Sequence, residues 1–135
     1  MKTPLLTSSL TLLLLTTSTT ALAFPNIRPL NTYPLATLQL ANDLTGANAL
    51  RSLPANGAPT TLAALFAGSA LVRNGALKAT SLQNVAPGVA VRCVLRRPGG
   101  EEVGSVSEQV TWLDLDGDKE GAREVDVAAW TVACQ

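Results

Sequence analysis

The chain has 135 residues, 47% of them hydrophobic, and its ten basic and ten acidic residues give a net charge near zero. It contains no histidine and only two cysteines. This composition excludes a serine or cysteine nucleophile activated by histidine, and it leaves too few ligands for a typical structural zinc site. We therefore predict no metal site, no bound cofactor and no enzymatic activity.

Residues 1–23 have the pattern of a secretory signal peptide. Lys2 precedes an apolar run from Leu5 to Leu15, and Ala21-Leu22-Ala23 supplies the small residues that signal peptidase requires. We expect cleavage between Ala23 and Phe24, and secretion of the remaining chain as a single domain.

A membrane anchor is the alternative interpretation of this N-terminal segment. Its uninterrupted leucine run, Leu12 to Leu15, is far shorter than the ~20 apolar residues that span a bilayer. The longest later apolar stretch, Leu62 to Val72, is interrupted by Gly68 and Ser69. We therefore expect residues 24–135 to leave the membrane once the signal is removed and to act outside the producing cell.

The first predicted strand is Leu35 to Leu40, in which alternate residues share a face. The next segment, Asn42 to Pro59, is rich in Asn, Gly, Pro and Ala, and is predicted to be a long loop that could display a recognition surface. Thr60 to Phe66 is ambiguous, because Thr60 could cap a short helix or the apolar run could form a buried strand.

The clearest local signal is Asn74-Gly75, which predicts a two-residue hairpin turn. Both residues accept the positive φ values of a type I′ turn, whose twist matches that of the flanking strands. Counting outward from the turn pairs Val72 with Leu77, so these two side chains are predicted to share the core face.

A second hairpin is predicted after the strand Val89 to Leu95, with its turn at Pro98-Gly99-Gly100. This turn places two arginines opposite two glutamates: Arg96 with Glu102, and Arg97 with Glu101. Two further strands are predicted, at about 107–115 and at 124–133. About seven short strands with turn residues between them indicate an all-β fold, a small antiparallel β-sandwich or barrel.

Cys93 and Cys134 are predicted to form one disulfide bond, because exported proteins fold in an oxidising environment. The bond would close a loop of about 40 residues and contribute roughly 4 kcal/mol to stability in the chain-entropy model. Two free thiols, or pairing with another chain, are the alternatives.

The segment Asp114-Leu115-Asp116-Gly117-Asp118 resembles the start of a calcium-binding loop. It departs from that pattern at Lys119, where the loop needs glycine, and at Val125, where it needs a bidentate glutamate. We therefore favour a solvated β-turn. The same acids could form a glycosidase pair, since Asp114 and Asp116 would share a strand face about 7 Å apart, but a solvated face is again favoured.

Trp112 and Trp130 have two interpretations. In the first, both side chains are buried in the core, which we favour for a domain so poor in aromatic residues. Exposure on a flat face would indicate a site that stacks on sugar rings. Apart from Arg96-Arg97, basic residues are scattered singly along the strands, with Tyr33 and Phe66 as accompanying aromatic residues, so no nucleic-acid partner is expected.

Several segments together resemble small secreted proteins of filamentous ascomycete fungi. They are Leu38 to Ala49, Ser69 to Leu71, Val91 to Val94, Leu113 to Gly117, and the near-terminal Cys134. Such proteins are treated as candidate effectors of plant-associated fungi, and the resemblance implies secretion and contact with a host without supplying catalytic residues.

The function we expect from the sequence is therefore that of a secreted, monomeric effector or elicitor, which binds a host protein or surface molecule without enzymatic activity. A cell-wall carbohydrate-binding module is the first alternative. A small hydrolase that uses carboxylates is the second.

Overall fold

The computed structural model describes residues 32–135 as one compact unit. The predicted signal peptide and the Ala23–Phe24 cleavage site lie outside the described residues. Within them the elements are β1 (Leu35–Asn42), β2 (Ala47–Pro54), β3 (Thr60–Thr61), α1 (Leu62–Leu65), β4 (Val72–Arg73), β5 (Ala76–Ala79), β6 (Ser81–Asn84), β7 (Arg92–Arg96), β8 (Glu102–Ser107), β9 (Trp112–Asp114), β10 (Val125–Asp126) and β11 (Thr131–Cys134).

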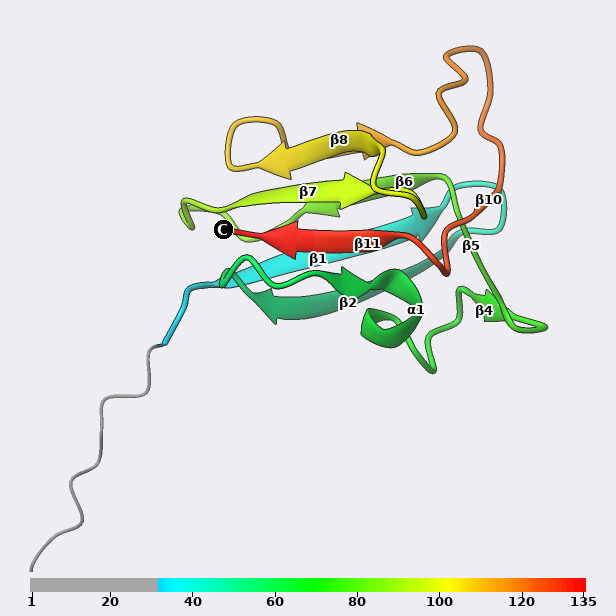
Figure 1. The fold of residues 1–135 in the computed structure, drawn as a ribbon. Coiled ribbons are helices and arrows are strands. Elements are labelled where there is room, and N and C mark those ends of the chain that lie inside the picture. The colour runs from blue at the N-terminus through cyan, green and yellow to red at the C-terminus, as the bar shows by residue number, and fades with distance from the viewer. Residues whose placement is uncertain (1–31) are drawn as a thin grey trace, which may run out of the picture. The chain divides into compact units, whose positions relative to one another are not determined.

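These strands form three antiparallel sheets (Figure 1). The first has the order β2-β1-β6-β9, the second β3-β11-β7-β8, and a small third sheet has the order β10-β5-β4. The buried side chains of the two four-stranded sheets belong to one hydrophobic cluster, so the prediction of a small all-β sandwich is confirmed. Within residues 32–135, no helix has the length and hydropathy needed to cross a membrane.

The chain has more strands than predicted because it also contains β2 and β3 and because a turn divides the strand expected at 124–133 into β10 and β11. Another turn shortens the strand expected at 107–115. After β8, the hydroxyl of Ser107 accepts hydrogen bonds from the backbone N–H groups of Gln109 and Val110, which separates β8 from β9. Between β10 and β11, the Asp126 carboxylate accepts from the N–H of Ala128. A short polar side chain that satisfies its own backbone favours a turn over a continuous ladder.

The prediction of a long loop over Asn42 to Pro59 was wrong, because the eight-residue strand β2 occupies most of it. β2 pairs along its whole length with β1, from Asn42 opposite Ala47 to Leu35 opposite Pro54. Alanine and asparagine are weak strand formers, and pairing with a partner strand overrides that propensity.

The Asn74-Gly75 hairpin is confirmed in its turn and register. Both turn residues have positive φ, 51° and 78°, and Val72 lies opposite Leu77. The predicted shared core face is wrong for one of the two: Leu77 is buried, whereas Val72 is 38% exposed. β4 is the outer strand of the small third sheet, so its side chains have less of the domain to pack against.

The second predicted hairpin is confirmed as β7 and β8. Arg96 lies opposite Glu102, and the backbone N–H of Arg97 donates to the carbonyl of Glu101. Both arginines form ion pairs with these glutamates, at 3.8 Å and 3.3 Å between nitrogen and oxygen. All four side chains are at least 45% exposed, so each pair contributes little, about 0.2–1 kcal/mol.

The segment from Thr60 to Phe66, for which a helix and a strand were both considered, contains a short strand followed by a short helix. Thr60 and Thr61 form β3, and a single helical turn, α1, follows. The cap is Thr61 and not Thr60, because the Thr61 hydroxyl accepts a hydrogen bond from the N–H of Ala64.

The predicted disulfide between Cys93 and Cys134 is confirmed. The two residues are directly opposite each other on β7 and β11, and both are buried in the core. The bond therefore fixes the last strand to the centre of the second sheet.

Candidate binding site

The outer face of the first sheet is open, because alternate residues of its strands point away from the core. On β1, Ala36, Leu38 and Leu40 are buried, whereas Thr37 and Gln39 on the opposite face are partly exposed. A period of two is what a strand produces when only one of its faces is covered. Side chains directly opposite one another across strands share a face, so the register of the sheet determines which outward groups are neighbours.

One line of outward side chains crosses all four strands. Leu50 on β2 lies opposite Gln39 on β1, Gln39 lies opposite Gln83 on β6, and Gln83 lies opposite Trp112 on β9. We call these four residues the cross-strand row. It brings together residues that are far apart in the sequence.

The two tryptophans have different environments. Trp130 is only 6% exposed and belongs to the hydrophobic core, with the guanidinium of Arg97 5.4 Å from its ring centre. Trp112 is 51% exposed, although an indole gains much from burial. Core placement is therefore confirmed for Trp130 and wrong for Trp112. Among the described residues, β9 is an edge strand of the first sheet, so Trp112 has a neighbouring strand on one side only.

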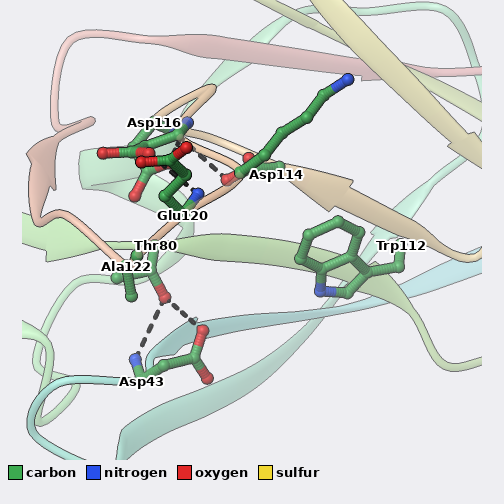
Figure 2. A pocket seen from close by; sticks show the side chains of 10 residues that line it. Asp43, Thr80, Trp112, Asp114, Asp116, Glu120 and Ala122 are labelled. Atoms are coloured by element: carbon green, nitrogen blue, oxygen red, sulfur yellow. Dashed lines mark hydrogen bonds between the residues drawn. The ribbon is translucent and has the colours of Figure 1, made fainter.

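A hollow of about 260 Å³ adjoins the Trp112 indole (Figure 2). Figure 2 shows Asp43 and Thr80 on one side of it and Asp114, Asp116 and Glu120 on the other, with Trp112 at the flank. The hollow thus combines one aromatic face with several hydrogen-bond acceptors and one cationic donor, Lys119.

Asp43 and Thr80 form one side of this hollow and are hydrogen bonded to each other. The buried Thr80 hydroxyl donates to Asp43 Oδ2 at 2.6 Å, and Thr80 Oγ1 accepts from the backbone N–H of Asp43 at 3.0 Å. The backbone carbonyl of Thr80 accepts from the N–H of Leu115 at 3.0 Å, which ties this wall to the turn after β9.

The turn after β9 uses its own carboxylates to organise its backbone. Asp114 Oδ1 accepts from the N–H of Asp116, Asp116 Oδ1 from that of Asp118, and Asp118 Oδ1 from that of Glu120. Each carboxylate thus accepts a hydrogen bond from the backbone N–H two residues later, as in an Asx-turn. Across the part of the chain that the structure describes, no group of three acidic or cysteine side chains is arranged to hold a metal ion. The interpretation as a turn is the one that this geometry supports.

The surroundings of Asp116 bear on the glycosidase pair considered from the sequence. It lies beyond the end of β9, so it does not share a strand face with Asp114 as predicted. The N–H groups of Asp118 and Arg123 hydrogen bond to its carboxylate and lower its pKa below the usual 3.8. A general acid needs a raised pKa, so the hydrogen bonding at Asp116 opposes the general-acid role and is compatible only with the ionised member of such a pair.

Sequence reasoning identified Trp112 and missed the other members of the cross-strand row. Leu50 was assigned to a loop, and neither glutamine has a motif around it. A recognisable signal was the alternation of Leu35 to Leu40, which places Gln39 on the polar face. The partners of Gln39 depend on register between distant strands, which one sequence does not reveal.

We compared the chain with protein-family models, with curated proteins and with solved structures, and none of the three comparisons found a match.

Proposed function

We propose that the protein is a secreted, non-enzymatic carbohydrate-binding protein and that Trp112 is the centre of its site. The observation that carries this proposal is the half-exposed indole of Trp112 on the open face of a four-stranded sheet. The sequence had left sugar binding as an alternative that required an exposed tryptophan on such a face.

The chemistry around Trp112 supports a sugar ligand. A pyranose ring presents an apolar C–H face, which can stack on an indole, and a rim of hydroxyl groups. The amide of Gln83 can both donate and accept hydrogen bonds, and the carboxylates of Asp43 and Asp114 accept them from hydroxyl groups. Gln83 lies opposite Trp112, and both acids line the adjoining hollow.

Secretion is supported by the signal-like N-terminus and by the Cys93–Cys134 disulfide, which is typical of oxidising compartments. The effector function expected from the resemblance to fungal secreted proteins fits this proposal, with a wall or surface glycan as the molecule that is bound. The engagement of the Asp116 carboxylate within its own turn argues against a general acid at this position.

A binding panel tests the proposal. Purified, oxidised residues 24–135 are incubated with insoluble cellulose, chitin and xylan, and the bound fraction is measured beside two variants, Trp112→Ala and Val72→Ser. Val72 is also exposed, but it lies on β4 of the third sheet. We expect retention of the wild type and of Val72→Ser on at least one polymer, and a loss of about tenfold in affinity, ~1.4 kcal/mol, for Trp112→Ala.

Equal retention of all three proteins would contradict a site at Trp112. Retention of none of them on any polymer would contradict carbohydrate binding itself.

A further inference from the structure

We infer that the whole cross-strand row, and not Trp112 alone, is the binding site, and that it takes a linear, uncharged polysaccharide chain laid across the strands. This inference rests on the proposed function and specifies its ligand. It requires contacts at Leu50 and Gln39, which are on the two strands farthest from Trp112.

The length of the row favours an extended ligand over a single sugar. Its four residues occupy four adjacent strands in continuous register. Neighbouring strands are ~4.8 Å apart, so three spacings from Leu50 to Trp112 give a row of about 14 Å. One sugar ring on Trp112 would leave the rest of the row in water.

The side chains in the row have free capacity to bind. None of the hydrogen bonds found among residues 32–135 uses the side-chain amide of Gln39 or Gln83, although both side chains are half-buried. Leu50 is 51% exposed at the other end of the row. Two unengaged amides between two apolar side chains match a polymer that alternates apolar ring faces with hydroxyl groups.

The charge of the face selects against other polymers. By register, the outward residues of the four strands are Leu35, Thr37, Gln39, Ala41, Asn48, Leu50, Ser52, Pro54, Ser81, Gln83, Trp112 and Asp114, of which Ser81 is buried. Of these strand residues only Asp114, at the Trp112 end, carries a charge. The hollow beside Trp112 adds one cation, Lys119, and further carboxylates, so this end of the row is negative overall. A nucleic acid or an acidic polysaccharide would be repelled there. A charged peptide finds no counter-charge along the rest of the row. An uncharged glycan needs none, so the charge of the face favours it.

The inference predicts a dependence on ligand length that a site limited to Trp112 would not show. Affinities of the oxidised protein for cello-oligosaccharides and N-acetylated chito-oligosaccharides, from disaccharide to hexasaccharide, are measured by calorimetry. The variants are Gln39→Ala, Leu50→Ser and Trp112→Ala, with Val72→Ser as the control. Thermal unfolding of each variant confirms that its fold is retained.

We expect wild-type affinity to rise with ligand length in one of the two series. Gln39→Ala and Leu50→Ser should each lose about fivefold in affinity for the hexasaccharide, the effect of ~1 kcal/mol, and nothing for the disaccharide. Trp112→Ala should lose affinity for both lengths, and Val72→Ser for neither.

Other outcomes would overturn the inference in distinguishable ways. If only Trp112→Ala weakens binding, at every length, the proposed function stands and the extended row is wrong. If the wild type binds no member of either series, the proposed function and the inference both fail. If sedimentation shows a dimer that Leu50→Ser and Gln39→Ala abolish, the face belongs to a second copy of the chain.

Discussion

Gln83 on β6 lies directly opposite Trp112 on β9, and both side chains point away from the core. The next residue pair in the same two strands, Leu82 opposite Leu113, points inward and joins the hydrophobic cluster. The same register that packs the core therefore also positions the candidate site. Changes that shift β9 should alter both stability and binding.

Substitution of Gly104 tests the close contact between β8 and Leu113 of β9. A Cβ added at Gly104 would lie 2.5 Å from Leu113 Cδ1, so Gly104→Ala should displace Leu113 and destabilise the domain by about 1–3 kcal/mol. Urea denaturation measures the loss. Leu113→Ala in the same chain removes the clashing atom, so the double variant should be more stable than the sum of the two single changes predicts. Simple additivity would show that the two residues are not in contact.

Removal of the disulfide should lower the stability of the fold without changing the pairing of its strands. For the double variant Cys93→Ser/Cys134→Ser we expect a loss of about 4 kcal/mol, because the bond closes a loop between residues 41 positions apart. Denaturation of wild-type and variant proteins under non-reducing conditions measures this. Equal stability of the two proteins would contradict the assigned bond, and intact mass before and after reduction provides the independent check.

Asn42 should be among the most sensitive polar positions. Its buried side chain donates to the Lys78 carbonyl at 3.3 Å and to Glu124 Oε1 at 2.8 Å, and its Oδ1 accepts from the N–H of Leu44 at 3.1 Å. Asn42→Ala removes all three hydrogen bonds of this buried side chain and should cost about 1–3 kcal/mol. The exposed Asn48 on β2 is the matched control, and Asn48→Ala should change stability little. Equal effects at the two positions would refute the role of this network.

Asp116 gives the domain a specific dependence on pH. Because backbone N–H groups lower the pKa of Asp116, its ionised form stabilises the fold above the unfolded pKa of 3.8, and that stabilisation is lost as pH falls through the lower folded pKa. Asp116→Asn should therefore be less stable than the wild type at neutral pH, with the difference shrinking in strong acid. Denaturation at neutral and at acidic pH tests this. A difference that is constant or that grows in acid would contradict it.

Local features of the chain could be predicted from the sequence because short segments determine them. Asn74-Gly75 specifies its turn through backbone conformation alone. The turn at Pro98 to Gly100 likewise fixes Arg96 opposite Glu102 by counting. The all-β class followed from the spacing of such turns.

Other features were missed because they depend on pairing between distant segments. β2 is rich in alanine and resembles a loop until β1 lies beside it. The exposure of Trp112 depends on β9 being an edge strand, which is a property of strand order and not of its neighbours in the sequence. Gln39 and Gln83 become neighbours only through the register of β1 with β6.

The most direct test of a carbohydrate site at Trp112 is a titration followed by NMR of the two indole N–H groups. The Trp112→Phe variant assigns the two signals, and the wild type is titrated with cellohexaose and with N-acetylated chitohexaose. We predict that one of the two glycans shifts the Trp112 signal saturably, while the signal of the buried Trp130 stays in place. Absence of any shift at Trp112 with both glycans, or a shift confined to Trp130, would contradict the proposed site.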